Sequence, residues 1–136
     1  NTAAGTNFSS MVQNCYSLQS VPLFNTAAGT NFSSMFNSCL SLQSVPNLNT
    51  KSGTIFTTIF STCPSLSSVL LSGTEYSIDY SSCKLSRYDI INIFNNLGAT
   101  GTGMSRTITT RTNYGSPDIT SIDSGIATGK YWTVSN

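Results

Sequence analysis

A tandem repeat constrains this chain more than any other feature. Residues 1–24 and 25–48 are identical at 18 of 24 positions, and residues 49–72 form a weaker third copy. A fixed period of this length is typical of repeat architectures, in which single units are too small to bury their apolar side and neighbours stack around a shared core. We therefore divide the chain into three repeats (1–24, 25–48 and 49–72) and a segment, 73–136, in which the period is lost.

The first half of each repeat has the apolar spacing of a short helix. Phe8, Met11 and Val12 lie at i, i+3 and i+4, which predicts one face of a helical turn, with Thr6 as its N-cap. The same residue types recur from copy to copy. The shared columns are Gly5, Gly29 and Gly53; Phe8, Phe32 and Phe56; Met11, Met35 and Ile59; Cys15, Cys39 and Cys63; Leu18, Leu42 and Leu66; and Val21, Val45 and Val69.

The second half of each repeat predicts a short strand. Alternation around Val21 and Leu23 favours a strand with one buried face. Pro22 and Pro46 stand in this strand, and a proline removes one hydrogen-bond donor from a ladder, so we expect the strands to be very short or the sheet to be interrupted. The predicted fold is therefore α/β, with each repeat contributing a strand, a loop and a short helix.

The order of the columns resembles a known repeat class. Residues 32–50 read F-x-x-M-F-x-x-C-x-x-L-x-x-V-x-x-x-N-T, which is similar to the BspA-type leucine-rich repeats of bacterial surface proteins, mycoplasma lipoproteins and some phage and protist proteins. The resemblance covers residues 1–72. It implies a leucine-rich-repeat solenoid of about three repeats with a short parallel sheet, and a location outside the cell, on a cell surface or on a virion.

The last segment, residues 73–136, predicts an α/β cap on the end of the stack. A strand is expected over 76–80, a helix after the capping box of Ser86 and Asp89, and Gly98 just past the end of that helix. Ile90, Ile91, Phe94 and Leu97 form the apolar stripe of that helix. We further expect a strand over 106–112 and a turn over 113–118. A short helix should follow, with Ile119, Ile122 and Ile126 inward, and end at Gly129, and a last strand should cover 131–134.

Composition excludes several classes of partner. Charged residues make up 8% of the chain, against a usual share of about 25%, and residues 1–50 contain none. This argues against nucleic acid, which needs a basic surface, and against an anionic membrane surface. No apolar run reaches the length of a membrane helix, so we expect no membrane insertion. Because the chain begins flush with a repeat and shows no signal peptide, we expect further repeats upstream.

Catalytic and metal-binding patterns are weak. The chain has no histidine, which excludes Ser–His and Cys–His nucleophile systems within it. A glycosidase needs two carboxyl groups flanking a cleft, and Asp79 is the best candidate because it lies in the middle of a predicted strand, although a solvated surface acid is the simpler interpretation. The other acids are Glu75, Asp89, Asp118 and Asp123. We therefore expect no enzyme.

The four cysteines are interpreted as small buried thiols, with one or more disulfides as the open alternative. No C-x-x-C pair or histidine accompanies them, so we expect no metal and no cofactor. The glycines at 98, 101 and 103 do not form a phosphate loop, because they follow a helix and lack the lysine. Asn7-Phe-Ser9 and Asn31-Phe-Ser33 are formal glycosylation sequons that also follow from duplication of one repeat column.

The remaining candidate site is the surface of the repeat strands. Residues between the buried positions should face outward in register; we call this set the outward strand face, and it comprises Ser20, Pro22, Phe24, Ser44, Pro46, Leu48, Ser68, Leu70 and Ser72. An uncharged, hydroxyl-bearing and partly apolar surface suits a host-cell surface glycan or protein. Other copies of the chain, or neighbouring subunits of an assembly, are further candidate partners.

We therefore expect a non-catalytic repeat scaffold for adhesion or assembly, displayed on a bacterial cell surface or on a phage virion as a fibre or decoration component. One alternative is a carbohydrate-active or glycan-binding accessory domain that uses the carboxylates of the cap. A second alternative is a self-associating filament subunit, because the open end of a stack exposes strand edges.

Overall fold

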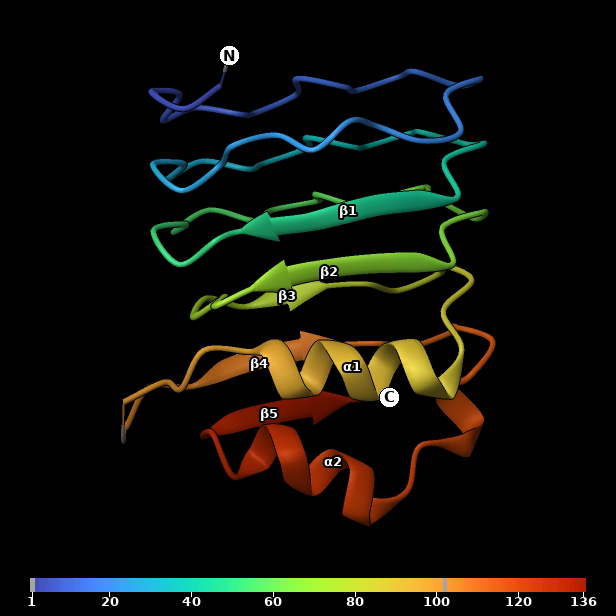
Figure 1. Cartoon of the computed structure of the whole chain (residues 1–136). Coiled ribbons are helices and arrows are strands. Elements are labelled where there is room, and N and C mark those ends of the chain that lie inside the picture. Colours follow the sequence, from blue (N-terminus) through green and yellow to red (C-terminus); the bar gives the residue numbers. More distant parts are fainter. Residues whose placement is uncertain (1, 102) are drawn as a thin grey trace.

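The computed structural model describes residues 2–101 and 103–136 and shows a mixed α/β fold with two layers (Figure 1). One layer holds the parallel strands β1 (Ser44–Asn49) and β2 (Ser68–Ser72), followed by helices α1 (Arg87–Asn96) and α2 (Ser121–Thr128). The other layer holds the turns of the repeats and a parallel sheet of order β3-β4-β5. Its strands are β3 (Ile78–Asp79), β4 (Arg106–Thr109) and β5 (Trp132–Ser135), and a short 3-10 helix, η1 (Ser116–Asp118), precedes α2.

The three repeats lie on top of one another in register. The rings of Phe8 and Phe32 stack with their centroids 5.5 Å apart, and those of Phe32 and Phe56 with theirs 5.4 Å apart. Phe36 and Phe60 begin a second column, with centroids 5.6 Å apart. All of these rings are buried, so the expectation of one shared core is confirmed.

The predicted short helix does not form in any of the repeats. Residues 9–14 are a series of turns, in which Ser10 and Asn14 adopt positive φ values of 55° and 62°. The same conformation recurs at the equivalent positions of the other copies, at Ser34, Ser38, Thr58 and Thr62. Thr6 is accordingly no N-cap, and its carbonyl instead accepts from the Thr30 amide and hydroxyl at 2.8 and 3.1 Å.

Hydrogen bonds between copies replace those of the helix. The amide of every second residue in the turn layer donates to a carbonyl of the next copy. The bonds are Phe8 to Asn31, Ser10 to Ser33, Val12 to Met35 and Asn14 to Asn37, then Phe32 to Ile55, Ser34 to Thr57, Phe36 to Ile59 and Ser38 to Ser61, at 2.8–3.0 Å. We call this arrangement the amide ladder. A stretch this short would form only a marginal helix, whereas stacking gives each of these amides a partner.

A bulge in β1 overturns one prediction for the outward strand face. Val45 pairs with Val69, but Leu48 pairs with Leu71, so β1 has one more residue than β2 between the paired positions. The extra residue turns Leu48 inward, where it is fully buried, instead of outward as predicted. In the first copy the same spacing leaves Leu23 71% exposed, although alternation predicted it to be buried.

The C-terminal segment forms most of the predicted elements. Ser86 and Asp89 make the predicted capping box, Leu97 is the C-cap of α1, and Gly98 follows it. Strand β4 is shorter than predicted, and η1 occupies the predicted turn. The predicted inward face of α2 is wrong at Ile122, which is 84% exposed, because Asp123 and Ala127 are buried instead.

The cysteines are all free thiols in this structure, so the disulfide alternative does not occur. Cys39, Cys63 and Cys83 are buried as predicted, whereas Cys15 is exposed. The Cys39 and Cys63 thiols donate to the carbonyls of Val12 and Phe36 at 3.0 and 3.1 Å. Burial raises the pKa of Cys63 to about 11 and that of Cys83 to about 12.

Candidate functional site

The outward strand face is partly exposed, and its serines lie in register from copy to copy. Ser20, Ser44 and Ser68 form a continuous row, in which Ser20 pairs with Ser44 through an isolated bridge and Ser44 with Ser68 in the β1–β2 sheet. Ser20, Pro22 and Ser68 are exposed, whereas Phe24, Ser44, Pro46, Leu70 and Ser72 are half-buried. Phe24, which occupies the position of Leu48 in the first copy, packs against the core instead of facing outward as predicted. The remaining residues form an uncharged strip.

A second site lies where the repeats meet the C-terminal segment, in the turn layer. Here the amide ladder stops: within the described residues, no hydrogen bond joins the amides of Phe56, Thr58, Phe60 or Thr62 to an acceptor. The cysteine column also loses its period at this point, because Cys83 follows Cys63 more closely in the sequence than Cys63 follows Cys39. The segment after the third copy forms β3, which pairs with β4 on its other side.

The ring columns show how the two parts separate. The second column continues from Phe60 to Tyr80 at 5.3 Å, but the planes of these rings are tilted by 19°, compared with 7° between Phe36 and Phe60. The first column ends at Phe56, which stacks on no further ring among the described residues. Between the third repeat and the C-terminal segment, ring stacking therefore continues at Tyr80 and stops at Phe56.

On the side of Phe56, the third repeat and the C-terminal segment are separated by a cleft of about 480 Å³, which we call the seam cleft. A neighbouring hollow of about 410 Å³ shares Thr58 and Asp79 with it. The seam cleft is lined by residues 54–58 from the third repeat, by residues 76–79, and by Arg106, Thr107 and Thr109. Most of the polar side chains among these are hydroxyls.

Two charged side chains line the seam cleft. The Arg106 guanidinium lies 4.3 Å from the centroid of the Tyr76 ring, and its Nε donates to the Glu75 carbonyl at 3.1 Å. Asp79 is exposed, and its Oδ1 accepts from the Ser81 amide and hydroxyl at 2.7 and 2.5 Å. Sequence analysis singled out Asp79 only as a candidate acid and missed Arg106, because an arginine at the start of a half-solvated strand carries no distinguishing signal.

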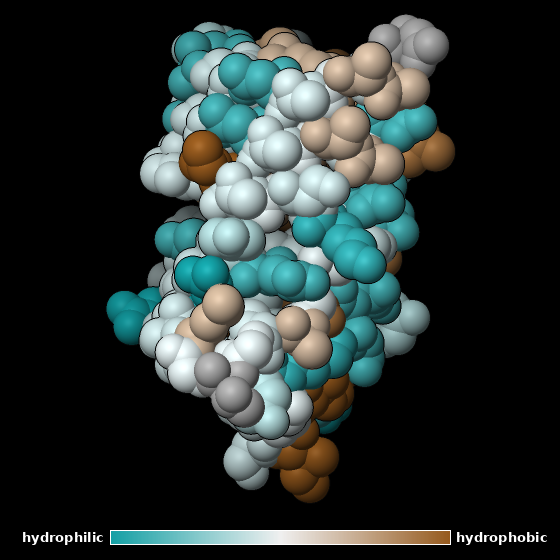
Figure 2. Space-filling model, turned by 90° about the vertical axis from the view of Figure 1, so that its left-hand side faces the viewer, coloured by the Kyte–Doolittle hydropathy of each residue, from teal (hydrophilic) through white to brown (hydrophobic). Residues whose placement is uncertain are grey.

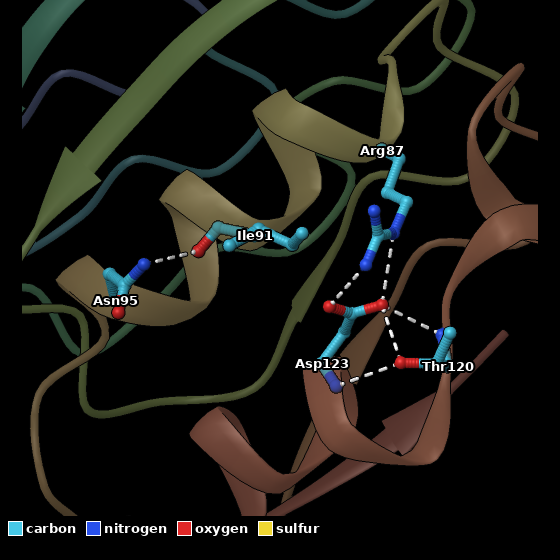
Figure 3. Close-up of polar contacts among 5 residues, drawn as sticks. All are labelled: Arg87, Ile91, Asn95, Thr120 and Asp123. Carbon is cyan, nitrogen blue, oxygen red and sulfur yellow. Dashed lines mark hydrogen bonds and ion pairs between the residues drawn. The ribbon is translucent and has the colours of Figure 1, made fainter.

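Two of the other carboxylates have structural roles. Asp123 accepts from Arg87 Nε and Nη2 at 3.0 and 2.9 Å and from the Thr120 amide at 2.8 Å, joining α1 to α2 (Figure 3). The Thr120 hydrogen bonds, followed by Arg87, hold the pKa of Asp123 below its ordinary value. Asp89 caps α1. Both carboxylates therefore help to fix the ends of the C-terminal helices.

The surface on the side shown in Figure 2 is mainly neutral to hydrophilic. Hydrophobic residues appear there as separate spots and at the lower end, at the level of α2 in Figure 1. In the part of the chain that the structure describes, no group of three or more cysteine or acidic side chains is placed to hold a metal ion. No helix in residues 2–101 or 103–136 is long and apolar enough to cross a membrane.

The chain was compared with protein-family models, with curated proteins and with solved structures. None of the three comparisons gave a match.

Proposed function

We propose that this chain is a non-catalytic module for adhesion or assembly that acts outside the cell, on a bacterial cell surface or a virion. Its architecture is proposed to be a leucine-rich-repeat solenoid of three copies, closed by residues 73–136 as a C-terminal cap. The observation that supports the proposal best is the in-register stacking of Phe8, Phe32 and Phe56, because it means that surface residues are also repeated in register.

The repetition supports a binding role for the outward strand face. Ser20, Ser44 and Ser68 present the same hydroxyl once per layer, and single contacts of this kind are weak. Linked contacts to a partner that itself repeats, such as a surface glycan or a protein array, add in free energy and give avidity without any strong individual site. The absence of charge from residues 1–50 favours neutral partners on this face.

The test is the retention of beads coated with the full chain on arrays of neutral glycans and of extracellular proteins. The triple variant Ser20→Gln, Ser44→Gln, Ser68→Gln places bulky uncharged groups along the row and should abolish retention. Its matched control is Ser105→Gln, Ser121→Gln, Thr128→Gln, at three exposed positions of the C-terminal segment, which should retain wild-type binding.

Two outcomes would count against the proposal. Retention that is equal in both triple variants, or absent in the wild type, contradicts binding by the outward strand face. Shortened oligosaccharides recovered from the arrays would contradict the non-catalytic role. Thermal melts of both variants establish that the chain remains folded.

A further inference from the structure

The amide ladder forms four continuous rows of peptide groups that end at the seam. In the first row the Phe8 amide donates to the Asn31 carbonyl. That carbonyl belongs to the peptide group between Asn31 and Phe32, whose N–H donates in turn to the Ile55 carbonyl. The other three rows repeat this connection, beginning at the amides of Ser10, Val12 and Asn14. Each row therefore links three peptide groups head to tail, one from each repeat.

The four rows of the ladder point the same way: each N–H is directed from one copy toward the next, so these peptide dipoles add as they do along an α-helix, with the positive end at the last N–H. A neighbouring row, in which the Asn31 and Ile55 amides donate to the Thr6 and Thr30 carbonyls, runs in the opposite direction and offsets part of their field. Hydrogen bonds in series also polarise one another. The last N–H groups belong to Phe56, Thr58, Phe60 and Thr62, which have no acceptor in the described chain. The positive ends of the rows therefore face the seam.

Arg106 adds an independent positive charge at the same place. Its guanidinium is held over Tyr76 and lines the seam cleft together with Phe56 and Thr58. Asp79 lies at the border between the cleft and the neighbouring hollow. An arginine in the same cleft as backbone amides that have no acceptor is a good match for one carboxylate, while Asp79 in the same lining disfavours a ligand with several negative charges.

The rest of the lining indicates what else the ligand contains. Hydroxyl groups surround the cleft, from Thr54, Thr57, Thr58, Ser77, Thr107 and Thr109. Apolar groups also line it: Ile55 is 44% exposed, whereas Phe56 and Ile78 are each only 4% exposed. A ligand that carries both hydroxyls and C–H faces suits this mixed lining better than a wholly apolar lipid or peptide.

We propose that the seam cleft binds an acidic saccharide, with its carboxylate against Arg106 and the amides of Phe56 and Thr58 and its hydroxyls against the threonine side chains. This inference rests on the proposed function, because it names a ligand class for a surface-binding module. It places that ligand in the turn layer, away from the outward strand face.

The experiment is a titration of the ¹⁵N-labelled full chain, followed through its backbone amide resonances. The probes are methyl β-glucuronide, its neutral counterpart methyl β-glucoside, sodium acetate and sodium sulfate. Methyl β-glucuronide should shift the Phe56 and Thr58 amides, whereas the equivalent amides of Phe32 and Ser34, which already have acceptors, should stay in place. The glucoside and acetate should each bind about tenfold more weakly or not at all, because each lacks half of the recognised groups.

Variants test the electrostatic part of the proposal. Arg106→Gln should weaken methyl β-glucuronide binding by about tenfold or more, whereas Asp79→Asn should tighten it by about three- to tenfold, because a like charge is removed. The controls are Arg111→Gln and Asp118→Asn, which change exposed charges outside the cleft. Thr54→Val should weaken binding, and Thr30→Val, its equivalent one repeat away, should not.

The outcomes separate this inference from the proposed function. Equal binding of glucuronide and glucoside, weaker binding in Asp79→Asn, or no shift at Phe56 and Thr58 overturns the acidic-saccharide site. Sulfate that binds as tightly as the glucuronide also overturns it, because the hydroxyl groups would then contribute nothing. Loss of bead retention in the outward-strand-face variant with unchanged glucuronide shifts shows that the two sites are independent.

Discussion

The repeats and the C-terminal segment use the same two layers but hold them together differently. In residues 1–72, order comes from the neighbouring copy, through stacked rings and the amide ladder. In residues 73–136, helices take the place of the strands of the first layer, and side chains within the segment fix their ends. Ser86 and Thr120 cap α1 and α2, Arg87 binds Asp123, and Lys130 binds the last carbonyls of α1.

This difference has a physical origin. A repeat followed by a similar copy finds acceptors for its turn-layer amides and partners for its rings at a fixed offset, so its order does not depend on charges or helix caps. A segment with no such neighbour must satisfy its helix ends locally, and ten of the eleven charged residues lie in it, the exception being Lys51. The seam cleft marks the boundary between the two arrangements.

Deletion of whole and partial repeats should have the largest effect. Removing residues 25–48 keeps the register of every column and should leave a folded, shorter chain, whereas removing residues 25–36 should abolish cooperative unfolding. Removing a stretch as long as one repeat from the C-terminal segment, residues 99–122, should also abolish it, because that segment has no spare copy. Thermal melts monitored by circular dichroism distinguish these results. If the two deletions within the repeats behave alike, the repeats are not modular.

Phe32→Ala should destabilise the chain by about 3–5 kcal/mol, because it removes a fully buried ring that stacks on both sides. Phe8→Ala is the matched control, since among the described residues Phe8 stacks on one ring, that of Phe32, and its loss should cost less. Urea denaturation gives both values. A Phe8 variant that is as unstable as the Phe32 variant would show that stacking between copies does not set the stability.

Alkaline pH should destabilise the chain under reducing conditions. Burial raises the pKa values of Cys63 to about 11 and Cys83 to about 12, so the folded state holds these protons more tightly than the unfolded state. The stabilisation is complete below the ordinary thiol value of 9.0 and is lost as the pH rises through the folded values. The melting temperature should therefore fall above pH 9.

Cys63→Ala and Cys83→Ala should each reduce this dependence, and Cys15→Ala, at an exposed position, should leave it unchanged. An identical pH profile in all three variants would assign the alkaline loss of stability to other groups.

Lys130→Met should have the smallest effect and should be confined to the C-terminal segment. The ammonium group donates to the carbonyls of Phe94, Asn95 and Leu97 at 3.2, 2.6 and 2.9 Å, and its loss should cost about 1 kcal/mol. Hydrogen exchange should accelerate in α1 and not in residues 25–48. Lys84→Met, which removes an exposed lysine of the same segment, is the control and should change neither.

The features that could be predicted from the sequence are those that depend on the repeat period or on local helix capping. The alignment of Phe8, Phe32 and Phe56 follows directly from the period, and the capping box at Ser86 and Asp89 defines α1. The helix expected over the first half of each repeat was wrong, because apolar residues at i, i+3 and i+4 also suit a series of turns with the same spacing. The amide ladder that stabilises those turns joins different copies and leaves no local pattern.

The site was less predictable than the fold. Leu48 was placed outward because strict alternation was assumed, and one extra residue in β1 reverses it. The shortened spacing between Cys63 and Cys83 is visible in the sequence. It does not show that Tyr80 continues one column of rings while the other column ends at Phe56. Arg106 enters the cleft only through the pairing of β4 with β3.

The amide ladder separates copy number from the chemistry of the cleft. A further in-register duplication would lengthen all four peptide rows by one group without altering any side chain at the cleft. The effect of aligned peptide dipoles falls off within about one helical turn, so a group added at the far end of a row would scarcely change the field at Phe56 and Thr58. A chain of this design can thus gain or lose repeats by recombination while the residues around the cleft keep their surroundings.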